Sequence, residues 1–213
     1  MNYRDKQCPQ RNCGYDEFEM AVEFTFDRER AAAAVVYLAA QHIPDLSKGK
    51  ICKLIFLADK HHLVRFGRPV TGDRICAMKD GPVPSNILNM LNRVLEDPGN
   101  PTVQLLSQHI FIDRQYIHPH FQAERFTLAE FLSESDIDSL RETVERFGGK
   151  TFSELRSMTH EMGAYKNAWE DRVNNAPDMA FEDLFEDDDD ALEGAREQMI
   201  ETDSMRKVFG AAF

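Results

Sequence analysis

The stretch KGKICKLIFLADKHHLVRFG, residues 48–67, decides the fold. Its apolar side chains recur at intervals of three and four residues, which is the period of one face of an α-helix. That face consists of Ile51, Leu54, Ile55, Ala58, His62 and Phe66. Gly67 is a natural end point, because glycine adopts the left-handed conformation without a Cβ penalty. The pattern predicts a helix over Lys48–Phe66.

Similar signals on both sides of this stretch predict four more helices. Three of them have defined limits, at Arg28–Gln41, Asn86–Leu95 and Asp136–Phe147. The fourth opens at a capping box formed by Thr151 and Glu154 and runs through Met158. A side-chain oxygen that can accept from the first free N–H groups stands before each of the other three. We therefore expect N-caps at Asp27, Ser85 and Ser135.

Short stretches between the helices favour β structure. Arg74–Lys79 alternates and predicts a small strand, and the Gly-Pro-Val-Pro run at 81–84 predicts an extended loop, because each proline fixes its φ angle. From Val103 to Phe126, β-branched and aromatic residues flank Asp113-Arg114-Gln115 and predict a hairpin or small sheet. The predicted fold class is mainly α (α+β), a compact helical domain with a small antiparallel β element.

Charge divides the chain of 213 residues into a near-neutral body and an acidic tail. Twelve acidic and three basic residues lie between Asp178 and Phe213, a balance of −9, which leaves −3 of the total −12 for residues 1–177. We expect a lead segment (1–26), a domain (27–177) and an acidic tail (178–213). The tail is either disordered or folds on a partner, with a helix over Ala191–Lys207, and a fully helical, docked tail is the alternative. The negative charge favours a basic protein partner and disfavours nucleic acid.

Cysteine content and hydropathy indicate the compartment. Four cysteines are too few for a disulfide scaffold, and the start MNYRDKQ lacks the pattern of a secretory signal. The longest smooth apolar run, Ala31–Ala40, is about half of the ~20 residues that cross a bilayer. We therefore expect a cytoplasmic protein that does not span a membrane. Cys8 and Cys13 are interpreted as free thiols, because a structural zinc site needs four ligands and no second pair follows.

Three stretches together resemble one known family. They are ADKHHLVRFGRPVTGDRICAMKDGPVPS (58–85), LSESDIDSLRETVERFGGKTFSEL (132–155), and Thr159-His160 with Ala168-Trp169. The combination is similar to the Panacea, or SocA-like, antitoxin domain of bacterial and phage toxin–antitoxin pairs, over roughly residues 31–172. The resemblance implies a mainly helical domain with a small β element that acts by binding a toxin. Ile75-Cys76 and Ile87-Leu88 depart from the residues common in the family.

The family motif supplies the candidate site residues. They are Asp59, His62, Gly67, Arg68, Pro69, Thr71, Gly72, Asp73, Gly81, Pro82, Pro84, Ser85, His160 and Trp169. The polar loop with Arg68, Thr71 and Asp73 is either a recognition surface or an internal scaffold that ties the loop to helix ends by charge-assisted hydrogen bonds. Trp169 is interpreted as a core anchor, with an exposed interface hot spot as the alternative.

Histidine positions raise the question of a metal site. Asp59 and His62 share a helix face, and His160 completes a set of three only if the last helix packs over the second. We interpret His62 as a buried histidine satisfied by Asp59 or by a backbone carbonyl, because a hydrolytic metal site needs three or more ligands. His118 and His120 are interpreted as part of a surface loop by the same reasoning. We expect no metal and no cofactor.

The functional prediction is an antitoxin that neutralises a cognate protein toxin by direct binding, without catalysis. The chain contains no P-loop, GxSxG elbow, HExxH motif or dinucleotide-binding glycine motif. One alternative is a proteolytic adaptor that tethers the toxin to a cellular protease, with the final Ala-Ala-Phe as a handle. Another is a metal-dependent hydrolase built on Asp59, His62 and His160. Transcriptional autoregulation is disfavoured by the charge of the chain.

Overall fold

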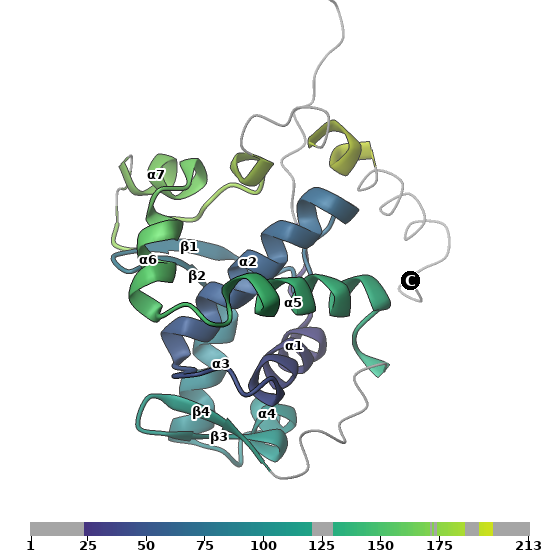
Figure 1. Ribbon diagram of the computed structural model, residues 1–213, viewed down its shortest axis with the longest axis vertical. Helices are drawn as coiled ribbons and strands as arrows, with labels where there is room; N and C mark the ends of the chain where they lie inside the picture. The colour runs from purple at the N-terminus through teal and green to yellow at the C-terminus, as the bar shows by residue number, and fades with distance from the viewer. Residues whose placement is uncertain (1–23, 121–129, 171, 173, 186–191, 198–213) are drawn as a thin grey trace, which may run out of the picture.

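The computed structural model describes residues 24–120, 130–170, 172, 174–185 and 192–197 of the chain. At its centre lies α2 (Lys48–Phe66), whose bounds equal the predicted ones. The Ser47 side chain caps its start by accepting from the Lys50 N–H, and Gly67 ends it at φ 71°, in the left-handed region. The elements packed on α2 include α1 (Arg28–Ala40), α3 (Ser85–Glu96), α5 (Glu134–Phe147) and α6 (Phe152–His160) (Figure 1).

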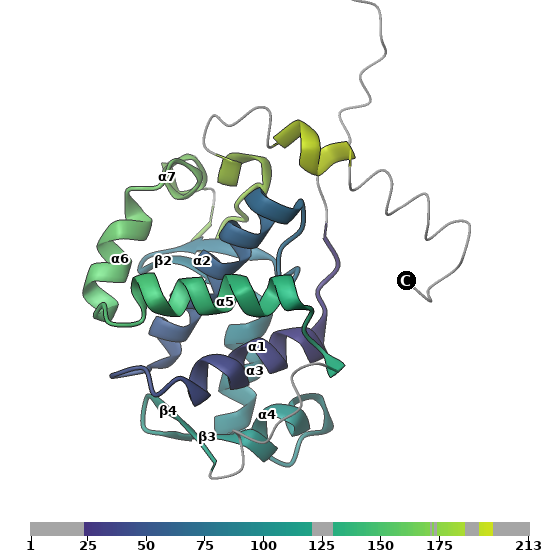
Figure 2. The same ribbon diagram turned by 45° about the vertical axis from the view of Figure 1, so that its right-hand side comes forward.

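Two of these helices, α1 and α5, pack directly on α2. The alanines at positions 31–34 of α1 are at most 1% exposed, and their small side chains let the helices approach closely. The predicted cap of α1 is confirmed, because the Asp27 carboxylate accepts from the Arg30 N–H at 2.9 Å. α5 crosses α2 and begins two residues earlier than predicted (Figure 2). The capping box of Thr151 and Glu154 at the start of α6 is also confirmed.

A first hairpin joins β1 (Ile75–Met78) to β2 (Gly81–Pro84) in antiparallel register, with Ile75 opposite Pro84 and Ala77 opposite Pro82. The sequence predicted an extended loop for the second of these segments, and here it is a strand. Its two prolines lack N–H groups, but β2 pairs with β1 alone in its sheet, so the strand tolerates them.

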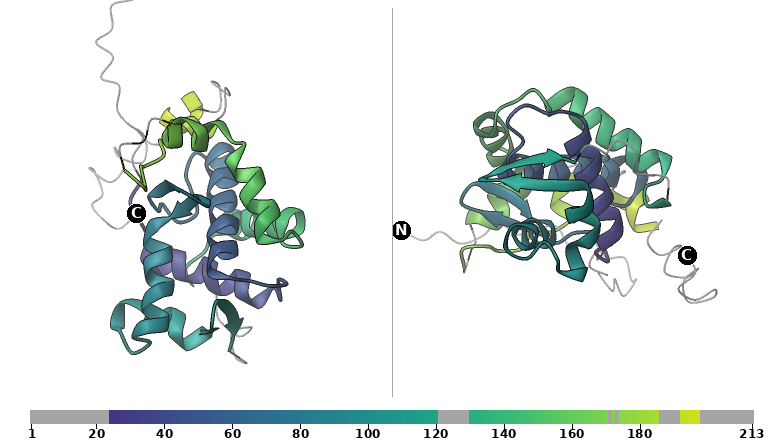
Figure 3. Two further views of the ribbon diagram at one scale, coloured as in Figure 1. Left: turned by 90° about the vertical axis from the view of Figure 1, so that its left-hand side faces the viewer. Right: turned by 90° about the horizontal axis from the view of Figure 1, so that it is seen from below.

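A second hairpin, β3 (Ile110–Asp113) and β4 (Tyr116–Pro119), confirms the predicted turn at Arg114, which has φ 56°. The β prediction was wrong for the residues just before it, because 104–109 form the short helix α4 (Gln104–His109) after a 3-10 turn at Pro101–Val103. Leu106 of α4 is fully buried and the helix packs on α1, so tertiary packing decided the conformation. Figure 3 shows this end of the molecule from below, with the hairpin beside α1.

The C-terminal part continues through α7 (Gly163–Glu170) to a 3-10 turn at Glu182–Phe185, and residues 192–197 are helical. Asp178 forms a β-bridge with Cys76, and Met179, Leu184 and Phe185 are buried. This described part of the acidic tail therefore packs on the domain, which differs from an unfolded tail. Residues 186–191 and 198–213 lie outside the described residues, as do Cys8 and Cys13.

The fold class predicted from the sequence is confirmed: the chain is mainly α with two small antiparallel sheets. Among the helices of the described residues, none combines the length and apolar character needed to cross a membrane.

Candidate functional site

The Asp59 carboxylate ties the loop after α2 to the helix. It is 2% exposed and accepts from the Thr71 N–H at 2.9 Å and from the Thr71 hydroxyl at 2.6 Å. Burial raises the pKa of Asp59 to about 7, although the hydrogen bonds from Thr71 act in the opposite direction. Asp59 therefore binds Thr71 and not His62, which leaves the backbone carbonyl as the alternative for that histidine.

His62 is fully buried and is satisfied by a backbone carbonyl, as one of the two sequence alternatives had it. Its Nδ1 lies 2.6 Å from the carbonyl oxygen of Arg68, and its Nε2 lies 3.0 Å from the Ser135 hydroxyl. Burial lowers the pKa of His62 to about 4, so the imidazole is neutral near pH 7. A neutral ring donates from Nδ1 to the carbonyl and accepts from Ser135 at Nε2.

Arg68 joins the same loop to the start of α5. One guanidinium nitrogen lies 2.9 Å from the Asp136 carboxylate, which is 1% exposed, and another donates to the Ser133 hydroxyl at 3.2 Å. Burial acts to raise the pKa of Asp136, but the hydrogen bond and charge of Arg68 hold it below its ordinary value. Ser133 is the N-cap of α5 and forms a capping box with Asp136. The predicted cap, Ser135, instead contacts His62.

Asp73 caps α3 from outside the helix. Its fully buried carboxylate accepts from the Asn86 N–H at 3.0 Å, the Ile87 N–H at 2.8 Å and the Asn86 side-chain amide at 2.9 Å. Ser85, the predicted cap, is the first residue of α3 and accepts from Arg74 Nε at 3.3 Å. The prediction was wrong because the better acceptor lies thirteen positions from Asn86 and only the fold brings it there.

Two glycines of the motif stand where a Cβ would clash with a neighbouring segment. Gly72 has φ +64°, and a Cβ there would lie 2.3 Å from the Thr25 carbonyl oxygen. Gly81 has φ +97°, and a Cβ there would lie 2.9 Å from Lys53 Nζ and 3.0 Å from Thr159 Oγ1. Both positions therefore need glycine, and Gly81 lets the β1–β2 hairpin close on α2 and α6.

The remaining motif residues also serve the packing. The Pro82 carbonyl oxygen accepts from Lys53 Nζ at 2.6 Å, and the Pro69 carbonyl oxygen accepts from Arg68 Nη1 at 3.2 Å. Pro84 is fully within β2. His160 stacks on Tyr165 with ring centroids 4.5 Å apart.

Trp169 continues this aromatic stack. It lies 5.9 Å from Tyr165 by ring centroids, and the Arg172 guanidinium covers it at 4.0 Å. Its side chain is half-buried and packs against the core cluster. The position lies between the two alternatives, a core anchor and an exposed hot spot.

The three residues of the hydrolase alternative are not brought together. Asp59 binds Thr71, His62 binds the Arg68 carbonyl, and His160 lies against Gly81. In the part of the chain that the structure describes, no three His, Cys, Asp or Glu side chains are grouped so that they could hold a metal ion. His118 and His120 both contact the ring of Phe111, at centroid distances of 5.1 and 5.4 Å.

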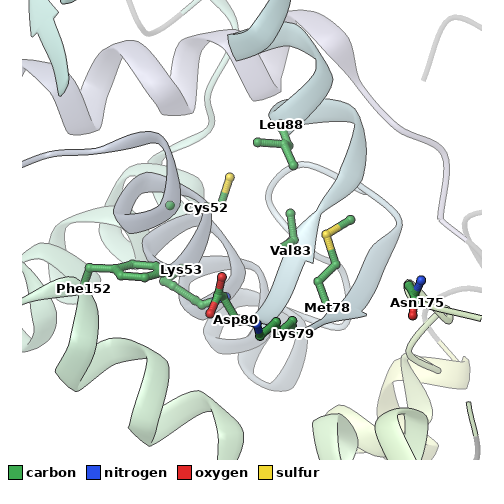
Figure 4. A pocket seen from close by; sticks show the side chains of 10 residues that line it. Cys52, Lys53, Met78, Lys79, Asp80, Val83, Leu88, Phe152 and Asn175 are labelled. Atoms are coloured by element: carbon green, nitrogen blue, oxygen red, sulfur yellow. The ribbon is translucent and has the colours of Figure 1, made fainter. Parts of the chain in front are cut away.

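A pocket of about 410 Å³ opens beside the β1–β2 hairpin. Its lining comes from α2, both strands, α3, the start of α6 and the segment before Asp178 (Figure 4). The lining residues are Gly49, Cys52, Lys53, Met78, Lys79, Asp80, Val83, Leu88, Phe152 and Asn175. Burial raises the pKa of the Cys52 thiol to about 12, so this thiol is an apolar wall and not a nucleophile.

With this geometry established, comparison with known families decides the identity. The family model described as antitoxin SocA-like, Panacea domain, matches residues 51–170. The chain belongs to the Panacea family. No significant similarity to a curated protein or to a solved structure was found. The match confirms the family predicted from the motif, and its range includes α2 from Ile51 onward, the β1–β2 hairpin and α6.

The Panacea motif therefore has two parts in space. Asp59, Arg68 and Asp73 form internal bonds that hold the loop to three helices, which is the geometry of the scaffold interpretation. The β1–β2 hairpin presents its Met78–Asp80 end to the pocket.

Sequence reasoning missed two residues of this arrangement. Asp136 was assigned only to the start of a helix, and its contact with Arg68 joins positions 68 residues apart in sequence. Lys53 was not singled out, although a single lysine inside the apolar run ICKLIFLA was a visible signal of a buried charge.

Proposed function

We propose that this Panacea protein is an antitoxin that neutralises a cognate protein toxin by binding it directly. The observation that carries the proposal is the family match over residues 51–170, since the family is that of SocA-like antitoxins. Binding alone suffices for this activity, with an interface on the order of 1,600 Å² and no cofactor. The partner is a protein, and the chain does not turn over a substrate.

The internal bonds of the motif loop support a binding role in an indirect way. Arg68, Asp73 and Asp59 are occupied by internal partners, so they hold the surface rigid instead of forming it. A rigid surface loses less conformational entropy when a partner binds. The motif thus contributes to affinity by preorganising the domain.

The contact surface that we assign to the toxin lies at the β3–β4 end. The exposed large apolar side chains of the described residues are Leu95, Phe111 and Tyr116. Phe111 is 45% exposed and stacks with His118, so it offers a wide aromatic face. Aromatic side chains of this kind are enriched among the residues that dominate binding energy.

Co-expression tests the proposal. The chain and the protein encoded beside it are expressed from separate inducible promoters, and growth and co-purification are measured. We expect restored growth, a stable complex, and a toxin half-life that the chain does not shorten. A shortened half-life would instead identify a proteolytic adaptor. Failure of the chain to restore growth would remove the proposal.

Surface variants locate the contact. Phe111→Ser removes an exposed ring, and we expect at least a tenfold weaker complex with little change in Tm. Arg28→Gln is the matched control, because Arg28 is exposed and lies at the start of α1. Equal toxin binding by both variants would show that the contact lies away from the β3–β4 hairpin.

We also propose that the acidic stretch Glu186–Asp190 contacts a basic groove of the toxin. The tail cannot be tested by deleting residues 178–213, because Met179, Leu184 and Phe185 belong to the core. Replacing the five acids by their amides removes the charge and retains Met179, Leu184 and Phe185. Unchanged neutralisation by this variant would exclude the charge contact.

A further inference from the structure

The pocket beside the β1–β2 hairpin has the size and lining of a small-molecule site. Its volume of about 410 Å³ lies within the range of about 300–1,000 Å³ that is typical of ligand pockets. Met78, Val83, Leu88 and the Phe152 ring give it apolar walls, and polar side chains stand among them. Such a lining suits a ligand with an apolar body and one polar group.

The charged side chains of the pocket lining are two lysines, Lys53 and Lys79, and one carboxylate, Asp80. Lys53 is 1% exposed, and its Nζ donates to the Pro82 carbonyl oxygen at 2.6 Å. Among the described residues, neither Lys53 nor Lys79 forms an ion pair, and Asp80 is engaged by Arg156 at 3.0 Å. A buried ammonium without a carboxylate is costly, because a carbonyl replaces its hydration only in part.

The side chains of Lys53 and Lys79 both line the pocket near Asp80. Figure 4 shows the Lys53 side chain passing from beside the Phe152 ring toward Asp80, with Lys79 next to it. Burial lowers the pKa of Lys53 to about 8, although the nearby charge of Asp80 acts in the opposite direction. An arriving anion would compensate the charge of Lys53.

We propose that this pocket binds a carboxylate carried on a short apolar group, with the apolar group against Met78 and Leu88 and the carboxylate toward the ammonium groups of Lys53 and Lys79. A phosphate fits less well, because a doubly charged group needs more donors than two lysines and apolar walls provide. The carboxylate belongs either to a free acid or to the end of a peptide. The proposal goes beyond toxin neutralisation and does not depend on it.

Titration of the purified chain tests the proposal with three probes: 3-phenylpropanoate, its uncharged amide, and an N-acetylated Ala-Ala-Phe peptide with a free carboxyl group. Amide ¹H–¹⁵N shifts of Gly49 and Asn175 report on the pocket. We expect the acid to bind roughly tenfold or more tightly than the amide, since hydrogen bonds to a charged group are worth about 1.5–3 kcal/mol. Binding of the peptide with the acid identifies a chain end as ligand, and binding of the acid alone identifies a free acid.

Two variants and a control complete the test. Lys79→Gln changes a side chain at the mouth and is expected to fold normally, and Lys53→Met removes the buried charge. Both variants should bind the acid several-fold more weakly than wild type does, with the affinity for the amide unchanged. Arg28→Gln, which makes the same charge change away from the pocket, should leave the affinities for the acid and for the amide unchanged. Equal binding of acid and amide, no binding of either, or insensitivity to Lys79→Gln would overturn the proposal.

Discussion

The cap of α3 allows a sharp test of the structure. Replacing Asp73 by alanine removes the acceptor of two backbone N–H groups, those of Asn86 and Ile87. Loss of an N-cap costs about 1 kcal/mol, and a buried donor left without a partner costs about 1–3 kcal/mol. Ile87 is fully buried, so water cannot replace the carboxylate at its N–H. Burial raises the pKa of Asp73, a desolvation cost that the variant regains in part.

Together these contributions predict that Asp73→Ala lowers the free energy of unfolding by about 2–4 kcal/mol. In a protein of this length the change lowers Tm by roughly 5–15 °C. Urea unfolding followed by far-UV circular dichroism measures the free energy, and a thermal scan measures Tm. Asp73→Asn retains one acceptor oxygen and should give an intermediate value.

The control is Ser85→Ala, which removes the side chain that local sequence rules identify as the cap. Its hydroxyl makes one long hydrogen bond to Arg74, so we expect a loss within about 1 kcal/mol. If Ser85→Ala destabilised the protein as much as Asp73→Ala, capping across the loop would be refuted.

Three further predictions follow from the same contacts. Folding raises the pKa of Asp59 from 3.8 to about 7, so the protonated carboxyl stabilises the fold fully below pH 3.8 and this contribution is lost as the pH rises to about 7. The difference in the free energy of unfolding between wild type and Asp59→Asn, measured in urea, should therefore change in favour of the variant across that pH range. A difference that stays constant would refute the pKa shift. Gly81→Ala places a Cβ 2.9 Å from Lys53 Nζ at a positive φ, and should cost about 2 kcal/mol or more in urea unfolding, whereas a neutral effect would contradict the tight closure of the hairpin. Arg68→Ala leaves the buried Asp136 carboxylate without the Arg68 guanidinium. Because the Arg68 side chain is 36% exposed, the free energy of unfolding should fall by an amount between the ~1 kcal/mol of a surface ion pair and the ~3–5 kcal/mol of a buried one. Weaker toxin binding with an unchanged Tm would instead assign Arg68 to recognition.

Local sequence rules predicted helix ends and caps correctly where the capping side chain lies within one helical turn of the backbone group that it binds. The bounds of α2, the Asp27 cap of α1 and the capping box of Thr151 are all set by neighbours three or four positions away. The cap of α5 was assigned to Ser135 instead of Ser133, because two serines two residues apart satisfy the same rule.

The site could be predicted only in outline. The family motif named Asp59, Arg68 and Asp73, but their partners are Thr71, Asp136 and the start of α3. A sequence shows that a residue carries a charge and cannot show which distant donor will compensate it. The same reason explains why the pocket and its lysines were not predicted.

The sequence by itself determined five of the helices, the turn of the β3–β4 hairpin and the family of this protein, because periodicity, caps and motif residues act over short spans of chain. The tertiary structure alone decided that 104–109 form a helix, that Met179 and Phe185 join the core, and that Lys53 is buried and forms no ion pair with another described residue. Those outcomes depend on which apolar surfaces and charges meet when distant segments pack, and the free energy of such contacts is not encoded in any local pattern.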